Sequence, residues 1–211
     1  TEARQPELDR IDQAVRQSSG GERIEWPVVN FWGVTGIGKT WLLDHINHRY
    51  QAPSKKRTLV LLHKFEEIEE ATILKTITRE LANKLASQLS SRFKAKEKTQ
   101  KALQEARDGN HHALIHALID CVQEKLVPII LFDNTEKLSA TTWEIVEKDL
   151  MEPLVLNGRI LFVIAGRRYI PRWRRFEVRR RVQEPHKTHL TPFNKESVAQ
   201  LLKDRNYAVD V

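Results

Sequence analysis

The stretch from Val28 to Leu43, VVNFWGVTGIGKTWLL, constrains the fold more than any other part of this chain. It contains the pattern G-x-x-x-x-G-K-[ST], from Gly33 to Thr40, with every fixed position filled. An apolar run precedes the glycines, and a helix-like run, Trp41 to Tyr50, follows them. A strand, a glycine-rich loop and a helix in this order predict a loop that binds phosphate groups.

The residue types in this loop suit a chain of phosphates. The start of a helix offers unpaired N–H groups and the positive end of its dipole, and glycines let the backbone bend close because they tolerate positive φ. Lys39 can reach the β-phosphate oxygens of ADP or ATP and the γ-phosphate oxygens of ATP, and the Thr40 hydroxyl can bind Mg²⁺. The alternative is a glycine-rich turn before an ordinary helix. The predicted nucleotide contacts of the loop are Gly33, Val34, Thr35, Gly36, Ile37, Gly38, Lys39, Thr40 and Trp41.

Composition places the chain among soluble globular proteins. It has 211 residues, of which 40% are hydrophobic and 30% charged, with a net charge of +7 that only weakly favours polyanionic partners. No apolar run approaches the ~20 residues of a membrane helix, and the polar stretch from Thr1 to Ser19 does not resemble a secretory signal. A single cysteine, Cys121, allows no internal disulfide. We therefore expect a cytoplasmic protein without membrane contact, and a chain that starts at Thr1 suggests a fragment of a longer multidomain protein.

Apolar runs bounded by polar or turn-forming residues predict the strands. The expected strands are Val28–Trp32, Thr58–Phe65, Val127–Asp133, Arg159–Ala165 and a weak fifth one at Lys187–Leu190. Because helical patterns separate them, we expect an α/β fold: a five-stranded, mostly parallel P-loop NTPase sheet covered by helices on both faces. All of residues 1–211 would form one ATPase domain, with an N-terminal helix over 1–20 and an α/β core over 21–211.

Helical spacing of apolar residues predicts the segments between the strands. Helices are expected at Thr1–Ser19, Trp41–Tyr50, Ile73–Leu89, His111–Leu126, Thr142–Leu156 and Lys195–Asn206. The highly charged stretch from Arg92 to Arg107 is either a solvated helix or a mobile excursion.

An acidic residue closes the third predicted strand. Asp133 ends the run IILFD, and ligands of parallel sheets bind at the carboxyl ends of strands. Beside a phosphate loop, Asp133 is expected to complete the Mg²⁺ shell with Thr40; a structural Asp is the alternative. Hydrolysis of ATP also needs a group that activates water. Asn134 stands where many phosphate-loop ATPases carry a second acid, so Glu136 is the candidate base, unless it merely caps a helix or faces solvent.

The fourth predicted strand ends in Ala165-Gly166-Arg167. An arginine at this edge can contact the γ-phosphate and report whether it is present. A salt bridge on the rim of the site is the alternative role for Arg167.

Together these residues resemble the STAND class of AAA-like ATPases, which includes the NB-ARC proteins. The resemblance rests on the phosphate loop, Asp133, the strand end at Arg167, the opening R-x-x-E-L at Arg4, and the motif Leu190-Thr191-Pro192-Phe193 before the last helix. It implies that Arg4 and Pro192 lie near the nucleotide. It also implies that the strand ending at Arg167 lies between the strand of the phosphate loop and that of Asp133.

The same resemblance implies a signalling switch that is closed with ADP and self-associates with ATP. Relatives carry effector and sensor domains in the same longer chain, and these would be its partners. Asn134 departs from the family pattern and implies slow hydrolysis of ATP to ADP and phosphate.

Two other functions stay open. Arginines crowd the segment from Arg167 to Arg181, with aromatic residues among them, which suits a nucleic-acid backbone. A neighbouring subunit's acidic surface, or its bound ATP, would suit them as well. The alternatives to the switch are thus a nucleic-acid-dependent ATPase of the loader or repair type, and a scaffold that binds nucleotide without turnover.

Overall fold

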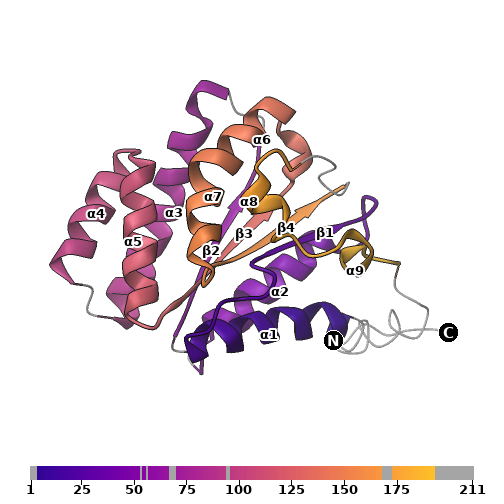
Figure 1. The fold of residues 1–211 in the computed structure, drawn as a ribbon, viewed down its shortest axis with the longest axis horizontal. Helices are drawn as coiled ribbons and strands as arrows, with labels where there is room; N and C mark the ends of the chain where they lie inside the picture. Colours follow the sequence, from indigo (N-terminus) through magenta and orange to yellow (C-terminus); the bar gives the residue numbers. More distant parts are fainter. Residues whose placement is uncertain are drawn as a thin grey trace, which may run out of the picture.

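The computed structural model describes residues 4–52, 54–55, 57–66, 70–93, 96–167 and 173–192. A four-stranded parallel sheet in the order β1-β4-β3-β2 forms its centre (Figure 1). The strands are β1 (Val28–Trp32), β2 (Thr58–Lys64), β3 (Val127–Asp133) and β4 (Leu161–Gly166). β4 therefore lies between the strand of the phosphate loop and the strand of Asp133, in the order implied by the family resemblance.

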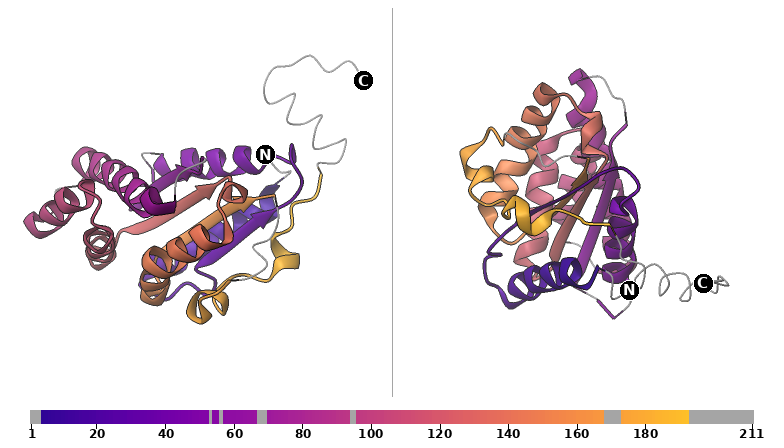
Figure 2. Two further views of the ribbon diagram at one scale, coloured as in Figure 1. Left: turned by 90° about the horizontal axis from the view of Figure 1, so that it is seen from above. Right: turned by 90° about the vertical axis from the view of Figure 1, so that its right-hand side faces the viewer.

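Helices cover both faces of this sheet (Figures 1 and 2). α1 (Gln5–Gly20) and α2 (Lys39–Gln51) lie on one face. The other face carries α3 (Glu70–Arg92), α5 (His111–Gln123), α6 (Ala140–Val146), α7 (Glu152–Asn157) and α8 (Phe176–Arg179), while α9 (Pro185–Thr188) lies beside β1. The predicted α/β class with two covered faces is confirmed.

Alternation along the strands explains the two cores. On β3, Ile130 and Phe132 pack against α3, α5 and α6, whereas Ile129 and Leu131 pack against α1 and α2. All seven residues of β3 are buried, which is why the run VPIILFD is almost continuously apolar. Asp133 is thus held at the end of a strand that is buried along its whole length, with 1% of its own surface exposed.

Side chains of α3 cover the outer edge of β2. The Gln88 amide donates to the Val60 carbonyl (2.5 Å), and its oxygen accepts from the Val60 N–H (3.0 Å). Lys84 donates to the Leu62 carbonyl. Since an open strand edge is a template for pairing with other chains, this cover gives the edge strand internal partners.

The charged stretch after residue 92 forms a packed helix and is no excursion. α4 (Glu97–Arg107) buries Thr99, Leu103 and Ala106 and lies against α5 and α3. In Figures 1 and 2 it is the outermost helix at its end of the molecule. The helix expected over 142–156 is interrupted by a π-helical turn, Glu147–Met151, directly before α7. Pro153, at the start of α7, has no N–H to donate, and its ring would clash with the carbonyl one turn earlier in a continuous α-helix.

The weak fifth strand at Lys187–Leu190 was the least accurate prediction. Among the described residues this region forms only two isolated bridges to β1, Val28 with Val182 and Trp32 with His189. The helical turn α9, which begins at Pro185, occupies the chain between them. The helix predicted at 195–206 lies outside the described residues. In the described part of the chain, no helix is both long and apolar enough to cross a membrane.

Candidate nucleotide-binding site

The predicted phosphate loop lies at the carboxyl end of β1 and leads directly into α2. Gly36 and Gly38 have φ angles of 85° and 90°, which side chains rarely adopt, and Gly38 is the residue that precedes the first turn of α2. Gly33 has a different role, since a Cβ there would lie 3.0 Å from the Leu190 carbonyl oxygen. The glycine pattern therefore shapes the loop and also lets the segment after α9 pack against it.

Lys39 points back across the loop. Its ammonium group donates to the carbonyls of Gly33 and Val34, both at 2.8 Å. Burial lowers the pKa of Lys39, and the opposing attraction of Glu136 and Asp133 does not outweigh it. These two acids and the lysine thus share one electrostatic environment, at the helix end where an anion is best stabilised.

Thr40 and Asp133 meet although 93 positions separate them. The Thr40 hydroxyl lies 2.9 Å from Asp133 Oδ2, and Asp133 Oδ1 accepts from the Asn134 N–H at 2.9 Å. Two oxygens bound at right angles to Mg²⁺ at ~2.1 Å would lie about 3.0 Å apart, so this pair fits that ion. The described residues contain no cluster of three or more acidic, His or Cys ligands.

Glu136 and Arg167 form an ion pair at the rim. Glu136 Oε1 lies 3.4 Å from Arg167 Nε, and Oε2 accepts from the Arg167 backbone N–H at 3.2 Å. The Thr135 hydroxyl donates to the Ala165 carbonyl at 3.3 Å and so joins the 3-10 turn Thr135–Lys137 to β4. Two predicted site residues are therefore held together, and the Arg167 side chain keeps 61% of its surface exposed.

Arg4 joins three segments that are remote in sequence. Its guanidinium donates to the carbonyls of Ile37 in the phosphate loop and Thr191 beyond α9, both at 2.9 Å, and to Glu7 at 3.3 Å. Only 2% of Arg4 is exposed. Pro192 follows Thr191 and is exposed. Arg4 thus contacts the phosphate loop itself, a role that its predicted place near the nucleotide did not include.

The arginine-dense segment is largely compensated by carboxylates where the structure describes it. Residues 168–172, with Arg168, Tyr169 and Arg172, lie outside the described part. Beyond them, four arginines have acidic partners: Arg174 with Glu144, Arg175 with Glu152, and Arg180 and Arg181 with Glu177.

A buried acid that the sequence analysis missed fixes this segment. Both Glu147 oxygens accept backbone N–H bonds, from Arg174 at 3.2 Å and Arg175 at 2.7 Å. Burial raises the pKa of Glu147, and the two hydrogen bonds oppose that shift. The sequence carries no motif for this acid, because its partners are main-chain N–H groups that any residue except proline supplies.

A loop with this lysine and threonine, beside an aspartate on a neighbouring parallel strand, defines the class of P-loop ATPases. The family model described as "AAA ATPase domain" matches residues 3–163. The chain accordingly belongs to the AAA ATPase domain family, which binds and hydrolyses ATP. A search of curated proteins finds no match.

Solved structures with the same fold come from this broad group. Cdc6p from Pyrobaculum aerophilum aligns with a TM-score of 0.57 and 17% identity, over 96% of this chain and 48% of that one. PCH-2 from C. elegans aligns with a TM-score of 0.50 and 12% identity, over 93% of this chain and 45% of that one. A Drosophila ORC structure with DNA and Cdc6 aligns with a TM-score of 0.55 and 8% identity, over 95% of this chain and 33% of that one.

These likenesses concern the fold alone, because all three identities are low. The chain spans less than half the length of each of these proteins. The prediction of a P-loop ATPase is confirmed, whereas these comparisons do not assign the chain to the narrower STAND class.

Proposed function

We propose that this domain is a Mg·ATP-dependent switch of the STAND type, which hydrolyses ATP slowly and controls self-association of a larger protein. The contact of 2.9 Å between Thr40 and Asp133 carries the proposal, because it places a hydroxyl and a carboxylate together beside the phosphate loop. The family supplies the ATPase chemistry. The switch is our inference from the rim of the site.

Each residue has a defined task in binding. The backbone N–H groups from Gly36 to Thr40 and the Lys39 ammonium hold the phosphates, since they form the positive end of α2. The two carbonyls that now accept from Lys39 give way to phosphate oxygens, which are stronger acceptors for an ammonium group. Thr40 and Asp133 hold Mg²⁺, which neutralises charge that develops on the phosphates.

The pair of Arg167 and Glu136 links the γ-phosphate to the rim. Arg167 is exposed, and one carboxylate is its partner, so a γ-phosphate offers its guanidinium a second anion. In the ADP state the pair with Glu136 persists. Contacts that form only with ATP favour one conformation, and their loss favours the other.

Slow turnover follows from the same pair. Asn134 cannot accept a proton from water. Glu136 is the nearest candidate, yet both its oxygens are engaged by Arg167. While this pair persists, neither carboxylate oxygen is free to take a proton from an attacking water.

The test compares the Lys39→Ala and Arg167→Ala variants with the unchanged chain. We expect Lys39→Ala to weaken ATP binding at least tenfold, because it removes a charge-assisted contact. Arg167→Ala should bind ADP normally but lose the difference between ADP and a non-hydrolysable ATP analogue in sedimentation velocity. If the unchanged chain releases no phosphate from ATP in the presence of Mg²⁺, the result favours a scaffold that binds nucleotide without turnover. Equal sedimentation of the unchanged chain in both nucleotides would reject the switch.

A nucleic-acid-dependent ATPase is the second candidate, and one surface feature favours it. Phe176 is 58% exposed, and the guanidinium groups of Arg179 and Arg180 lie 5.8 and 5.5 Å from its ring centre. Exposed aromatic and arginine side chains bind single strands by stacking and by charge. The Drosophila ORC structure is of a complex bound to DNA, which is a property of that protein. Stimulation of phosphate release by single-stranded DNA, lost in Phe176→Ala, would select this candidate.

A further inference from the structure

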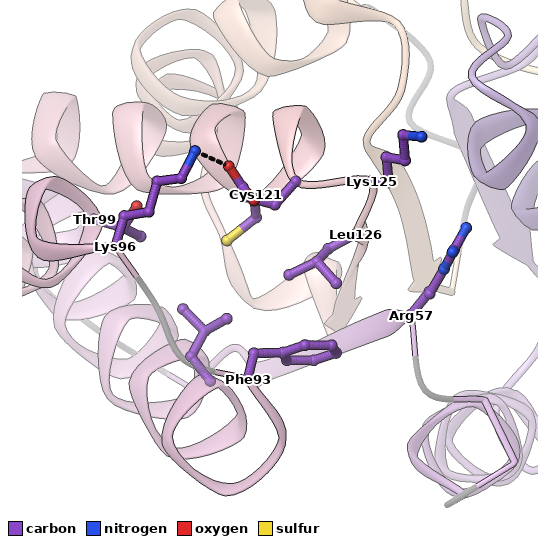
Figure 3. A pocket seen from close by; sticks show the side chains of 9 residues that line it. Arg57, Phe93, Lys96, Thr99, Cys121, Lys125 and Leu126 are labelled. Atoms are coloured by element: carbon purple, nitrogen blue, oxygen red, sulfur yellow. Dashed lines mark ion pairs between the residues drawn. The ribbon is translucent and has the colours of Figure 1, made fainter.

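A second cavity, remote from the phosphate loop, lies at the amino-terminal ends of β2 and β3. It has a volume of about 250 Å³ and opens between the ends of α3 and α5 and the start of α4 (Figure 3). Arg57 precedes β2 and Leu126 precedes β3, whereas the nucleotide site lies at the opposite, carboxyl ends of the strands. Nine residues line it: Arg57, Leu89, Phe93, Lys96, Thr99, Cys121, Glu124, Lys125 and Leu126.

The floor of this cavity is apolar. Leu89, Cys121 and Leu126 belong to the main hydrophobic core and are 3%, 2% and 6% exposed. Phe93 packs against the same core from the end of α3. In Figure 3 the Cys121 sulfur, the Leu126 side chain and the Phe93 ring surround the hollow. Burial raises the pKa of Cys121 to about 12, so the thiol contributes apolar surface and no charge.

The mouth of the cavity is cationic. Lys96 and Glu124 form an ion pair on one side, and Arg57 and Lys125 lie on the other (Figure 3). Neither Arg57 nor Lys125 has a carboxylate partner in the part of the chain that the structure describes. The mouth therefore carries three cations and one acid, Glu124, and the cations of Arg57 and Lys125 are available to a bound anion.

The backbone of Lys125 adopts a left-handed conformation, in which glycine is the preferred residue. Its φ is 61°, and it follows α5 in a turn closed by bonds from Lys125 N to Val122 O and from Leu126 N to Cys121 O, both 3.0 Å. Helices that end in this way usually carry glycine at this place, since a side chain there is strained. The chain thus accepts strain and keeps a positive charge at the mouth, a combination found where side chains serve a ligand.

We propose that this cavity binds a small carboxylate with a short apolar tail. The tail would lie on Leu89, Phe93, Cys121 and Leu126, and the carboxylate would contact Arg57 and Lys125, because a guanidinium binds carboxylates through paired hydrogen bonds. The volume equals about eight water molecules of ~30 Å³ each, which admits one alkyl chain or one ring and excludes larger ligands. Octanoate has this chemistry and size. This site is independent of the proposed switch.

Calorimetry measures this binding directly. We expect titration with sodium octanoate to give a saturable heat of binding. The neutral alcohol octanol and the tail-free anion acetate should each give little heat at equal concentration. Equal binding of octanol would overturn the proposal, because charge would then play no part.

Variants locate the binding site. Lys125→Gly removes the charge and the backbone strain together, so it should fold at least as well and bind octanoate about tenfold more weakly. Arg57→Gln should show a similar loss, and Lys101→Gln, an exposed lysine of α4 outside the cavity, should show none. Lys39→Ala should keep octanoate affinity. Unchanged affinity in both cavity variants, or loss in Lys39→Ala, would refute the assignment.

Discussion

The Arg4 contact gives the sharpest test of how the phosphate loop is supported. Arg4→Ala removes two hydrogen bonds of 2.9 Å, to the Ile37 and Thr191 carbonyls, and the ion pair with Glu7. A hydrogen bond to a charged group contributes about 1.5–3 kcal/mol, and buried acceptors left without a donor add to the cost. Because Arg4 is 2% exposed, solvent screens little of this. We expect a loss of about 3–5 kcal/mol in the free energy of unfolding.

Urea unfolding followed by circular dichroism measures this loss, and a fluorescent ATP analogue measures the effect on the loop. Arg16→Ala is the matched control, since Arg16 is an exposed arginine of the same helix and should change stability by less than about 0.5 kcal/mol. Arg4→Ala should also weaken nucleotide binding, because Ile37 lies within the loop. If the two variants unfold at the same urea concentration and bind nucleotide equally, the support we assign to Arg4 is absent.

Three further predictions concern the metal, pH and the sheet edge. Asp133→Asn should raise the Mg²⁺ concentration that half-saturates ATP binding by at least tenfold; an unchanged midpoint would remove Asp133 from the metal site. Burial raises the pKa of Glu80, but hydrogen bonds from His63 and Lys84 outweigh it and lower the pKa to about 2. This acid therefore stabilises the fold above about pH 4.5, and its contribution of about 1 kcal/mol is lost as the pH falls toward 2. Glu80→Gln should flatten the acid limb of a plot of melting temperature against pH, and an identical slope would contradict this. Gln88→Ala should cost about 1–3 kcal/mol in urea unfolding and promote aggregation, because it leaves the Val60 backbone unpaired; the exposed Gln104→Ala is its control, and equal stability would count against the edge cover.

The strands were the easiest part of the fold to predict from the sequence. Val28–Trp32 and Val127–Asp133 have the predicted bounds because each is an apolar run with a polar or glycine residue directly after it. The weak run at Lys187–Leu190 lacks this signal. The proline-led turn α9 leaves it a single isolated bridge to β1, between His189 and Trp32.

The site was predictable only in part, for a physical reason. Motifs along the chain predict Lys39, Thr40 and Asp133 as the residues that hold Mg·ATP, because phosphate chemistry demands those residue types. The support around them depends on folded contacts between distant residues, such as Arg4 with the Thr191 carbonyl. A buried arginine that binds backbone carbonyls leaves no pattern in composition or periodicity, since its partners are main-chain atoms that any residue supplies.

The Arg4 bridge has a consequence for the order in which the protein is made. It joins residues 187 positions apart, and β1 pairs along its length with β4, which is synthesised much later. Contacts between such distant segments form slowly, because a long loop must close first. The phosphate loop therefore cannot reach its supported form while the chain is still emerging. ATP should bind only after nearly all of this domain has left the ribosome, so nucleotide binding marks completed folding.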